Sequence, residues 1–91
     1  MKSSKIQKLE NDLKKLRKTP QNARAIQKLA KALGRVTVNR GAEPNWINPK
    51  FPVLRPVSIP DHGGKDLAIG TKNAILNQLE DDIAEWKLAS D

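Results

Sequence analysis

The sequence predicts a small α+β domain in which two helices precede three strands and a third helix closes the order. Its 91 residues suffice for one domain with a compact core, because a chain of this size buries only about 60% of its unfolded surface. Apolar residues recur at helical spacing in the first third and in the last quarter of the chain. After Gly34 the periodicity changes from helical to alternating, which is typical of strands.

The first predicted helix has Ser4 as its N-cap and ends near Lys18. One apolar stripe runs along it at helical spacing, formed by Ile6, Leu9, Leu13 and Leu16. Lysines fill the other faces. Because a helix of about 14 residues is marginal in isolation, we expect it to dock either on the domain or on a partner.

The second predicted helix has Thr19 as its N-cap and Pro20 at the first helical position, where the missing N–H costs nothing. Gly34 supplies its left-handed stop. Its inward face is formed by Ala23, Ile26, Leu29, Ala30 and Leu33. Its outer face carries a basic ridge at positions i, i+4 and i+7, formed by Arg24, Lys28 and Lys31.

Three strands are predicted between the second helix and the last. Residues 35–40 alternate polar with β-branched residues, as a strand with one buried face does. Residues 45–48 predict a short second strand, and residues 53–59 predict the third. Pro56 has no N–H to donate, so the third strand should lie at a sheet edge or contain a bulge.

Trp46 and Phe51 are two of the three aromatic residues of the chain. They could stack on splayed bases, but we favour core positions for both. The final predicted helix is capped by Gly70–Thr71, and its buried side is formed by Ile75, Leu76, Leu79, Ile83 and Trp86. Acidic residues crowd its later turns, where the helix dipole disfavours negative charge: Glu80, Asp81, Asp82 and Glu85. We expect these carboxylates to be solvated or to face a basic surface, which could be formed by the chain's own lysines.

The net charge of +7 is unevenly distributed. Residues 1–41 hold 12 Lys and Arg against 2 Asp and Glu, whereas residues 42–91 hold 5 against 8. Positive charge concentrated in one half suits a polyanion-binding surface, because each neutralised phosphate releases counterions. The alternative is that these lysines only keep exposed helix faces soluble.

Several classes of protein are disfavoured by composition. There is no cysteine, which excludes disulfides and thiolate zinc sites, and one histidine with scattered acids predicts neither a metal nor a cofactor. No apolar run approaches the roughly 20 residues that span a membrane. The segment Met1–Lys5 lacks the apolar core of a secretory signal, so we expect a cytoplasmic protein with one domain over residues 1–91.

Residues 59–79 resemble the signature of the HicA toxin family. In that family a strand ends in a Pro–x–His step, and a lysine-containing loop leads to Leu–x–x–Gly–Thr and a helix with a paired Ile–Leu. The matching residues here are Pro60–Asp61–His62, Lys65, Leu67–Thr71 and Ile75–Leu76. The resemblance implies a fold similar to double-stranded-RNA-binding domains, with a three-stranded antiparallel sheet, an αβββα core over residues 19–91 and an additional helix over residues 1–18. Such domains recognise A-form RNA by its shape, phosphates and 2′-hydroxyls.

The resemblance further implies a toxin of a toxin–antitoxin pair that binds RNA, cleaves mRNA and is neutralised by a HicB-like antitoxin covering its active site. The family carries its catalytic histidine in a Gly–Ser–His step at the start of the second strand. Here that stretch is Gly41–Ala42–Glu43. Glu43 could act as the base only if burial raised its pKa or if a weaker base sufficed, and otherwise it is an ordinary turn carboxylate beside Pro44.

His62 is the only histidine, so any imidazole chemistry has to use it. It is either catalytic together with Glu43 or a solvated loop residue at the Gly63–Gly64 turn. The predicted RNA contacts are Arg24, Lys28, Lys31, Arg40, Arg55 and Lys65. The alternative to an mRNA endoribonuclease is a catalytically inactive RNA- or protein-binding module on the same fold, and a third reading treats the basic helices as a surface for an acidic protein.

Overall fold

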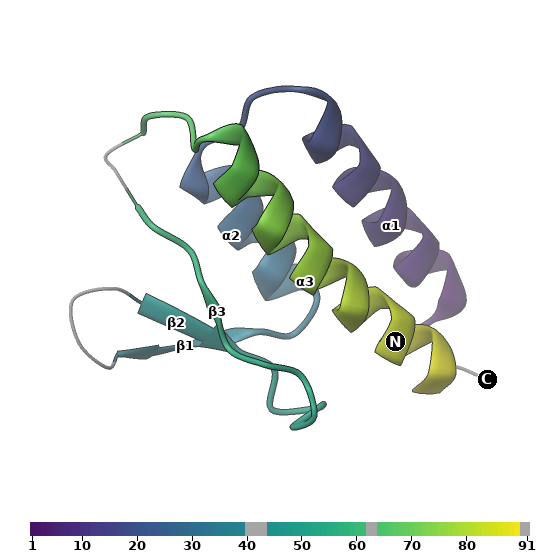
Figure 1. Cartoon of the computed structure of the whole chain (residues 1–91). Coiled ribbons are helices and arrows are strands. Elements are labelled where there is room, and N and C mark those ends of the chain that lie inside the picture. Colours follow the sequence, from purple (N-terminus) through teal and green to yellow (C-terminus); the bar gives the residue numbers. More distant parts are fainter. Residues whose placement is uncertain (40–43, 62–63, 90–91) are drawn as a thin grey trace.

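The computed structural model of the chain describes residues 1–39, 44–61 and 64–89. Its elements follow the order α1 (Ser3–Lys18), α2 (Ala23–Ala32), β1 (Val36–Asn39), β2 (Pro44–Ile47), β3 (Val57–Ser58) and α3 (Ile69–Ala89). The predicted α+β class and the ααβββα order are therefore confirmed (Figure 1).

The strands form an antiparallel sheet in the order β1-β2-β3, with the helices against one face (Figure 1). In the register, Trp46 lies opposite Thr37 on one side and opposite Val57 on the other. Directly opposed residues point to the same face of a sheet. Because Trp46 and Val57 are buried, this is the face that packs on the helices, and the core position predicted for Trp46 is confirmed.

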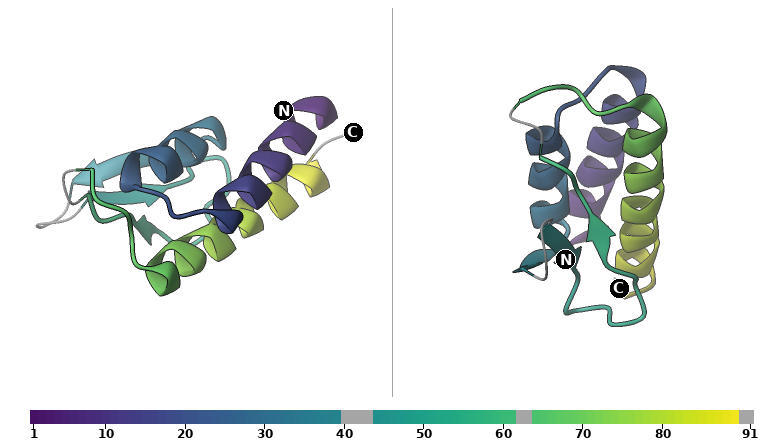
Figure 2. Two further views of the ribbon diagram at one scale, coloured as in Figure 1. Left: turned by 90° about the horizontal axis from the view of Figure 1, so that it is seen from above. Right: turned by 60° about the vertical axis from the view of Figure 1, so that its left-hand side comes forward.

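Helix α1 docks on the domain, which settles the question that the sequence left open. It packs against both α2 and α3, and Ile6, Leu9 and Leu13 are buried in the common core (Figure 2). The prediction of Ser4 as N-cap is wrong, because the helix begins at Ser3 after Lys2, whose side chain makes no capping hydrogen bond. Tertiary packing of the apolar stripe, rather than a cap, therefore holds α1 in place.

The start of α2 was also predicted too early. Thr19 ends α1, and Asn22 is the N-cap of α2, with its Oδ1 accepting a hydrogen bond from the Ala25 N–H at 3.1 Å. Residues 21 and 22 are held extended, because the Leu67 N–H donates to the Gln21 carbonyl at 2.8 Å and Asn22 forms a β-bridge with Asp66. The predicted stop is confirmed: Gly34 adopts a φ of +98°, where other residues are strained.

The first strand has the opposite orientation to the one that its alternation predicts. Arg35 is buried with 2% of its surface exposed, whereas Val36 is 48% exposed. The guanidinium of Arg35 pairs with Asp82 of α3 inside the domain, and this pair sets which face of the strand turns inward. Periodicity counts apolar side chains, so it cannot detect an arginine that is buried by pairing.

The third strand is shorter than predicted. Only Val57–Ser58 pairs with β2, so the strand begins after Pro56 and lies at the sheet edge, as the missing N–H of proline requires. Helix α3 begins at Ile69 rather than after Gly70–Thr71. Among the described residues, no helix combines the length and the apolar character needed to cross a membrane.

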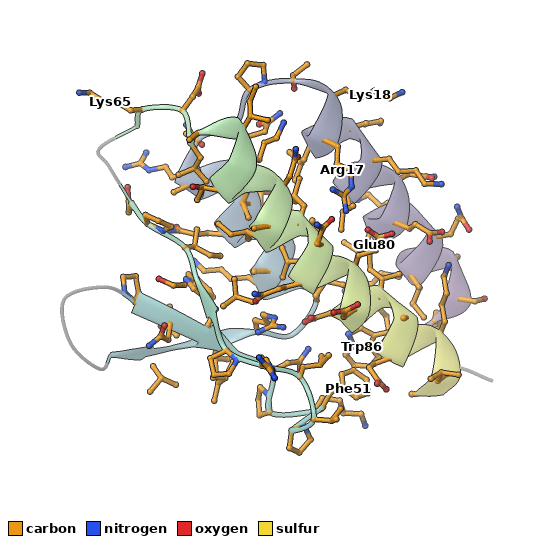
Figure 3. All side chains as sticks on the ribbon, viewed as in Figure 1. Arg17, Lys18, Phe51, Lys65, Glu80 and Trp86 are labelled. Carbon is orange, nitrogen blue, oxygen red and sulfur yellow. The ribbon has the colours of Figure 1, made fainter. Side chains whose placement is uncertain are left out.

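The buried side of α3 matches the prediction apart from its end. Ile75, Leu76, Leu79 and Ile83 are in the core, whereas Trp86 is half-buried. Phe51 is also half-buried rather than in the core. It packs edge-on against Trp86 with ring centroids 4.8 Å apart, at the foot of α3 (Figure 3).

Candidate nucleic-acid interface

The residues predicted to act in catalysis, His62 and Glu43, lie outside the described residues, and so does the predicted RNA contact Arg40. The candidate site therefore rests on the basic side chains. Five of the six predicted RNA contacts are described, on α2, on the segment before β3 and on the loop before α3.

The basic ridge of Arg24, Lys28 and Lys31 is exposed along α2. None of the three forms an ion pair with a residue that the structure describes. The Nζ of Lys31 lies 5.8 Å from the centroid of the Trp46 ring, a cation–π contact that holds the end of the ridge beside β2. The ridge thus presents three cations to solvent from one helix.

Lys65 belongs to the same end of the molecule as the start of the ridge. Its loop is hydrogen-bonded to residues 21 and 22, immediately before Arg24. The Lys65 side chain is exposed and extends away from the domain (Figure 3). Arg55 is exposed as well, but its carbonyl accepts from Nη1 of Arg35 at 3.0 Å, which places it where α2 ends. The structure therefore brings Lys65 close to the start of the ridge. Arg55, which precedes β3, lies near the other end of α2.

A second group of cations surrounds a groove of about 710 Å³ between α1 and α2. We call it the α1–α2 groove, and its basic residues, the groove lysines, are Lys5, Lys8, Lys15 and Lys28. Lys28 belongs to both the ridge and the groove. The sequence predicted the apolar stripes of both helices. Helical periodicity does not indicate whether two such helices pack tightly along their whole length or leave a groove between them.

Two of the four acidic residues on the later turns of α3, Glu80 and Asp82, pair with the chain's own cations, which are arginines rather than the lysines suggested by the sequence. Arg17 of α1 pairs with Glu80, and the two side chains point toward each other between the helices (Figure 3). Lys87 lies 2.6 Å from a carboxylate oxygen of Glu10, and this hydrogen bond lowers the pKa of Glu10 below its ordinary value. Ion pairs therefore link α3 to α1 and to Arg35, whereas the cations of the ridge have no ion-pair partner among the described residues.

A buried polar network lies behind the interface. Arg35 binds Asp82 through two hydrogen bonds of 2.8 and 2.6 Å, and its Nη1 donates to the carbonyls of Trp46 and Arg55. Asn48 adds hydrogen bonds from Nδ2 to the Leu33 carbonyl and to Asp82. The network joins the end of α2, two strand segments and α3. It holds the scaffold in position and presents no polar atom to a ligand.

The described residues contain no group of three or more His, Asp or Glu side chains that could hold a metal ion. Comparison with protein-family models, with curated proteins and with solved structures finds no match to this chain. The function therefore has to be argued from the chain's own residues.

Proposed function

We propose that this chain is a HicA-like RNA-binding protein, the toxin-type member of a toxin–antitoxin pair, built on a double-stranded-RNA-binding type of scaffold. The observation that carries the proposal is the exposed basic ridge on α2, extended by Lys65 from the neighbouring loop. The antiparallel sheet with helices on one face supports it, because such α+β modules bind A-form RNA through backbone contacts.

The ridge has the geometry of a phosphate-contacting row. Arg24 and Lys31 are seven residues apart, which corresponds to about 10 Å along a helix, with Lys28 between them. All three are exposed and carry no competing carboxylate among the described residues. Contacts of this kind position a duplex without reading its sequence. The proposed binding is therefore sequence-tolerant and sensitive to salt.

Binding is tested with an RNA duplex of about 16 base pairs, the span of a double-stranded-RNA-binding domain. Replacing the three ridge residues with Gln should weaken binding by about tenfold or more at moderate salt and reduce the salt dependence. The control triple, with Gln at Lys2, Lys14 and Lys18, removes the same charge from α1 and should change the affinity much less. Absence of any RNA affinity at low salt would remove the proposal.

Cleavage is a separate part of the proposal, and it rests on His62 with Glu43. Induction of the protein alone should arrest growth and shorten transcripts, and a HicB-like antitoxin should reverse both effects. Changing either residue to Ala should abolish them. If induction is harmless and RNA stays intact while duplex binding persists, the chain is an inactive RNA-binding module. The replacement of the family's Ser–His by Ala42–Glu43 favours that second candidate.

A further inference from the structure

We propose that the α1–α2 groove is a docking site for an acidic amphipathic helix of another protein. The proposal goes beyond RNA binding and does not depend on it, because the groove shares only Lys28 with the basic ridge. It rests on the shape of the groove, the apolar character of its floor and the sign of the charge around it.

The groove is a trough whose two walls are helices. One wall is α1 from Ser4 to Leu16, and the other is α2 from Ala25 to Ala32. At the rise of a helix these walls are about 18 and 10 Å long, so the trough accommodates two to three turns of a third helix. The two helices are antiparallel, so both walls extend the same way from the short connection that joins them (Figure 2).

The floor of the groove is apolar. It is formed by Leu9, Leu16, Ala25, Leu29 and Ala32. Two of these are alanines on α2, so the space between the helices is left open where larger side chains would have filled it. An apolar stripe at positions i, i+4 and i+7 of a docked helix would fill this space, as amphipathic helices do in other hydrophobic grooves.

The positively charged side chains around the groove favour a negatively charged partner. Lys5, Lys8 and Lys15 stand on the α1 wall and Lys28 on the α2 wall, and Asp12 is the single carboxylate among the lining residues. None of these lysines forms an ion pair within the described part of the chain. A helix with glutamates on both sides of its apolar stripe would meet cations on both walls, and complementary charge would also speed its association.

RNA does not fit this groove as well as it fits the ridge, because a phosphate backbone gains nothing from a floor of leucine and alanine. A second copy of the chain does not fit either. Its acidic helix, α3, buries its apolar side in its own core, and its carboxylates Glu80 and Asp82 are already paired. The occupant that matches both floor and rim is therefore an acidic amphipathic helix from another protein.

The test uses the full chain and a fluorescent peptide of about 15 residues, with leucines at i, i+4, i+7 and i+11 and mainly glutamate at the flanking positions. Fluorescence anisotropy should show binding with one peptide per chain. Gln at Lys5, Lys8 and Lys15 should weaken it by about tenfold, while Gln at Lys2, Lys14 and Lys18, an equal loss of charge, should stay within about twofold. Ala25→Leu, which fills the floor, should abolish binding while circular dichroism shows an unchanged fold.

Five results would overturn the proposal. A scrambled peptide of the same composition that binds equally well would show that only charge matters. Equal losses in the two lysine triples would show that the groove is not the site, and lack of binding by the designed peptide would remove the proposed class of partner. Displacement of the peptide by duplex RNA, with RNA affinity lost in the groove triple as much as in the ridge triple, would assign the groove to RNA. A dimer in sedimentation that the groove triple dissociates would assign it to a second copy.

Discussion

Helix α1 meets its two neighbours in different ways. Toward α3 it is held by the Arg17–Glu80 and Glu10–Lys87 pairs, and the buried Nζ of Lys72 donates to the carbonyls of Arg17 and Thr19 at 3.0 Å each. Toward α2 it leaves the α1–α2 groove, whose lysines have no ion-pair partner among the described residues. One side of the helix is fully packed and paired, and the other is open and basic.

The difference shows that the basic first half and the acidic second half of the sequence do not form separate basic and acidic regions in the folded molecule. In the acidic second half, Glu80 and Asp82 of α3 pair with Arg17 and Arg35 from the basic first half. The cations of the ridge and the groove lie on or beside α2, where Asp12 is the single carboxylate among the residues that line the groove. Positive charge that the fold does not compensate is available for an external anion, which is why both proposals concern the α2 side.

The largest effect should follow from breaking the α3 side at its buried ion pair. Asp82→Ala leaves the guanidinium of Arg35 buried without its carboxylate, and removing one member of a buried pair typically costs about 3–5 kcal/mol. Chemical denaturation should show this loss in the free energy of unfolding. A loss below about 1 kcal/mol would mean that the pair does not hold the helix and sheet together.

A matched double variant separates the lost packing from the orphaned charge. Arg35→Met with Asp82→Leu replaces both members by apolar side chains of similar size, so no buried charge remains. It should recover part of the stability that Asp82→Ala loses, because isolated buried charges cost more than apolar substitutes. A double variant no more stable than the single one would place the effect in the hydrogen bonds from Arg35 to the Trp46 and Arg55 carbonyls, which the single variant keeps and the double variant loses.

The next effect concerns the junction of α1 and α3. Lys72→Met keeps the aliphatic stem but removes the ammonium that donates to the carbonyls of Arg17, in the last turn of α1, and of its C-cap Thr19. Hydrogen bonds from charged donors contribute about 1.5–3 kcal/mol, so we expect a loss in this range. Amide hydrogen exchange should show faster exchange in α1 and little change in α2. Equal acceleration in both helices would contradict a local role for this contact.

How far the sequence predicts this molecule depends on the kind of residue. Helices and strands appear in the right order, because apolar periodicity responds to the core that stabilises them. All three predicted helix starts were wrong: Ser4 and Thr19 are not N-caps, and α3 begins at Ile69, before its predicted cap at Gly70–Thr71. The inward face of β1 was predicted wrongly from the alternation of polar and β-branched residues. The burial of Arg35 depends on Asp82, which is 47 residues away in the sequence.

The candidate site shows the same limit. The exposed ridge follows from helical spacing alone, so Arg24, Lys28 and Lys31 could be predicted as a row. The groove could not, because it depends on how α1 crosses α2 and on alanines that look like ordinary core residues. An arginine directly after a helix stop, with an aspartate among the apolar positions of a later helix, is the signal that could have revealed the buried pair.

A smaller effect compares the two sides of α1 directly. Arg17→Gln removes an exposed pair with Glu80 and should cost no more than about 1 kcal/mol, with the loss shrinking at high salt. Lys15→Gln removes a groove lysine and should leave stability unchanged or slightly improved, because it relieves repulsion among like charges. Thermal unfolding at low and high salt distinguishes the two. Equal losses in both variants would mean that the open side is as well paired as the α3 side.

The smallest effect concerns Glu10 and is seen in its dependence on pH. The hydrogen bond from Lys87 lowers the pKa of Glu10 from its ordinary value of 4.5 in the folded state. A carboxyl group whose pKa is lower in the folded state stabilises the fold above its unfolded-state pKa, and this contribution disappears as the pH falls through the folded-state pKa. Glu10→Gln should therefore be slightly less stable than the parent at neutral pH, and the difference should vanish in acid well below 4.5. Nuclear magnetic resonance titration of the Glu10 carboxyl measures the shift directly, and Lys87→Gln should return its pKa toward the ordinary value. If that titration were unchanged by Lys87→Gln, the pair would be too exposed to count as part of the packed side of α1, and the α3 side would depend on Lys72 and Arg17 alone.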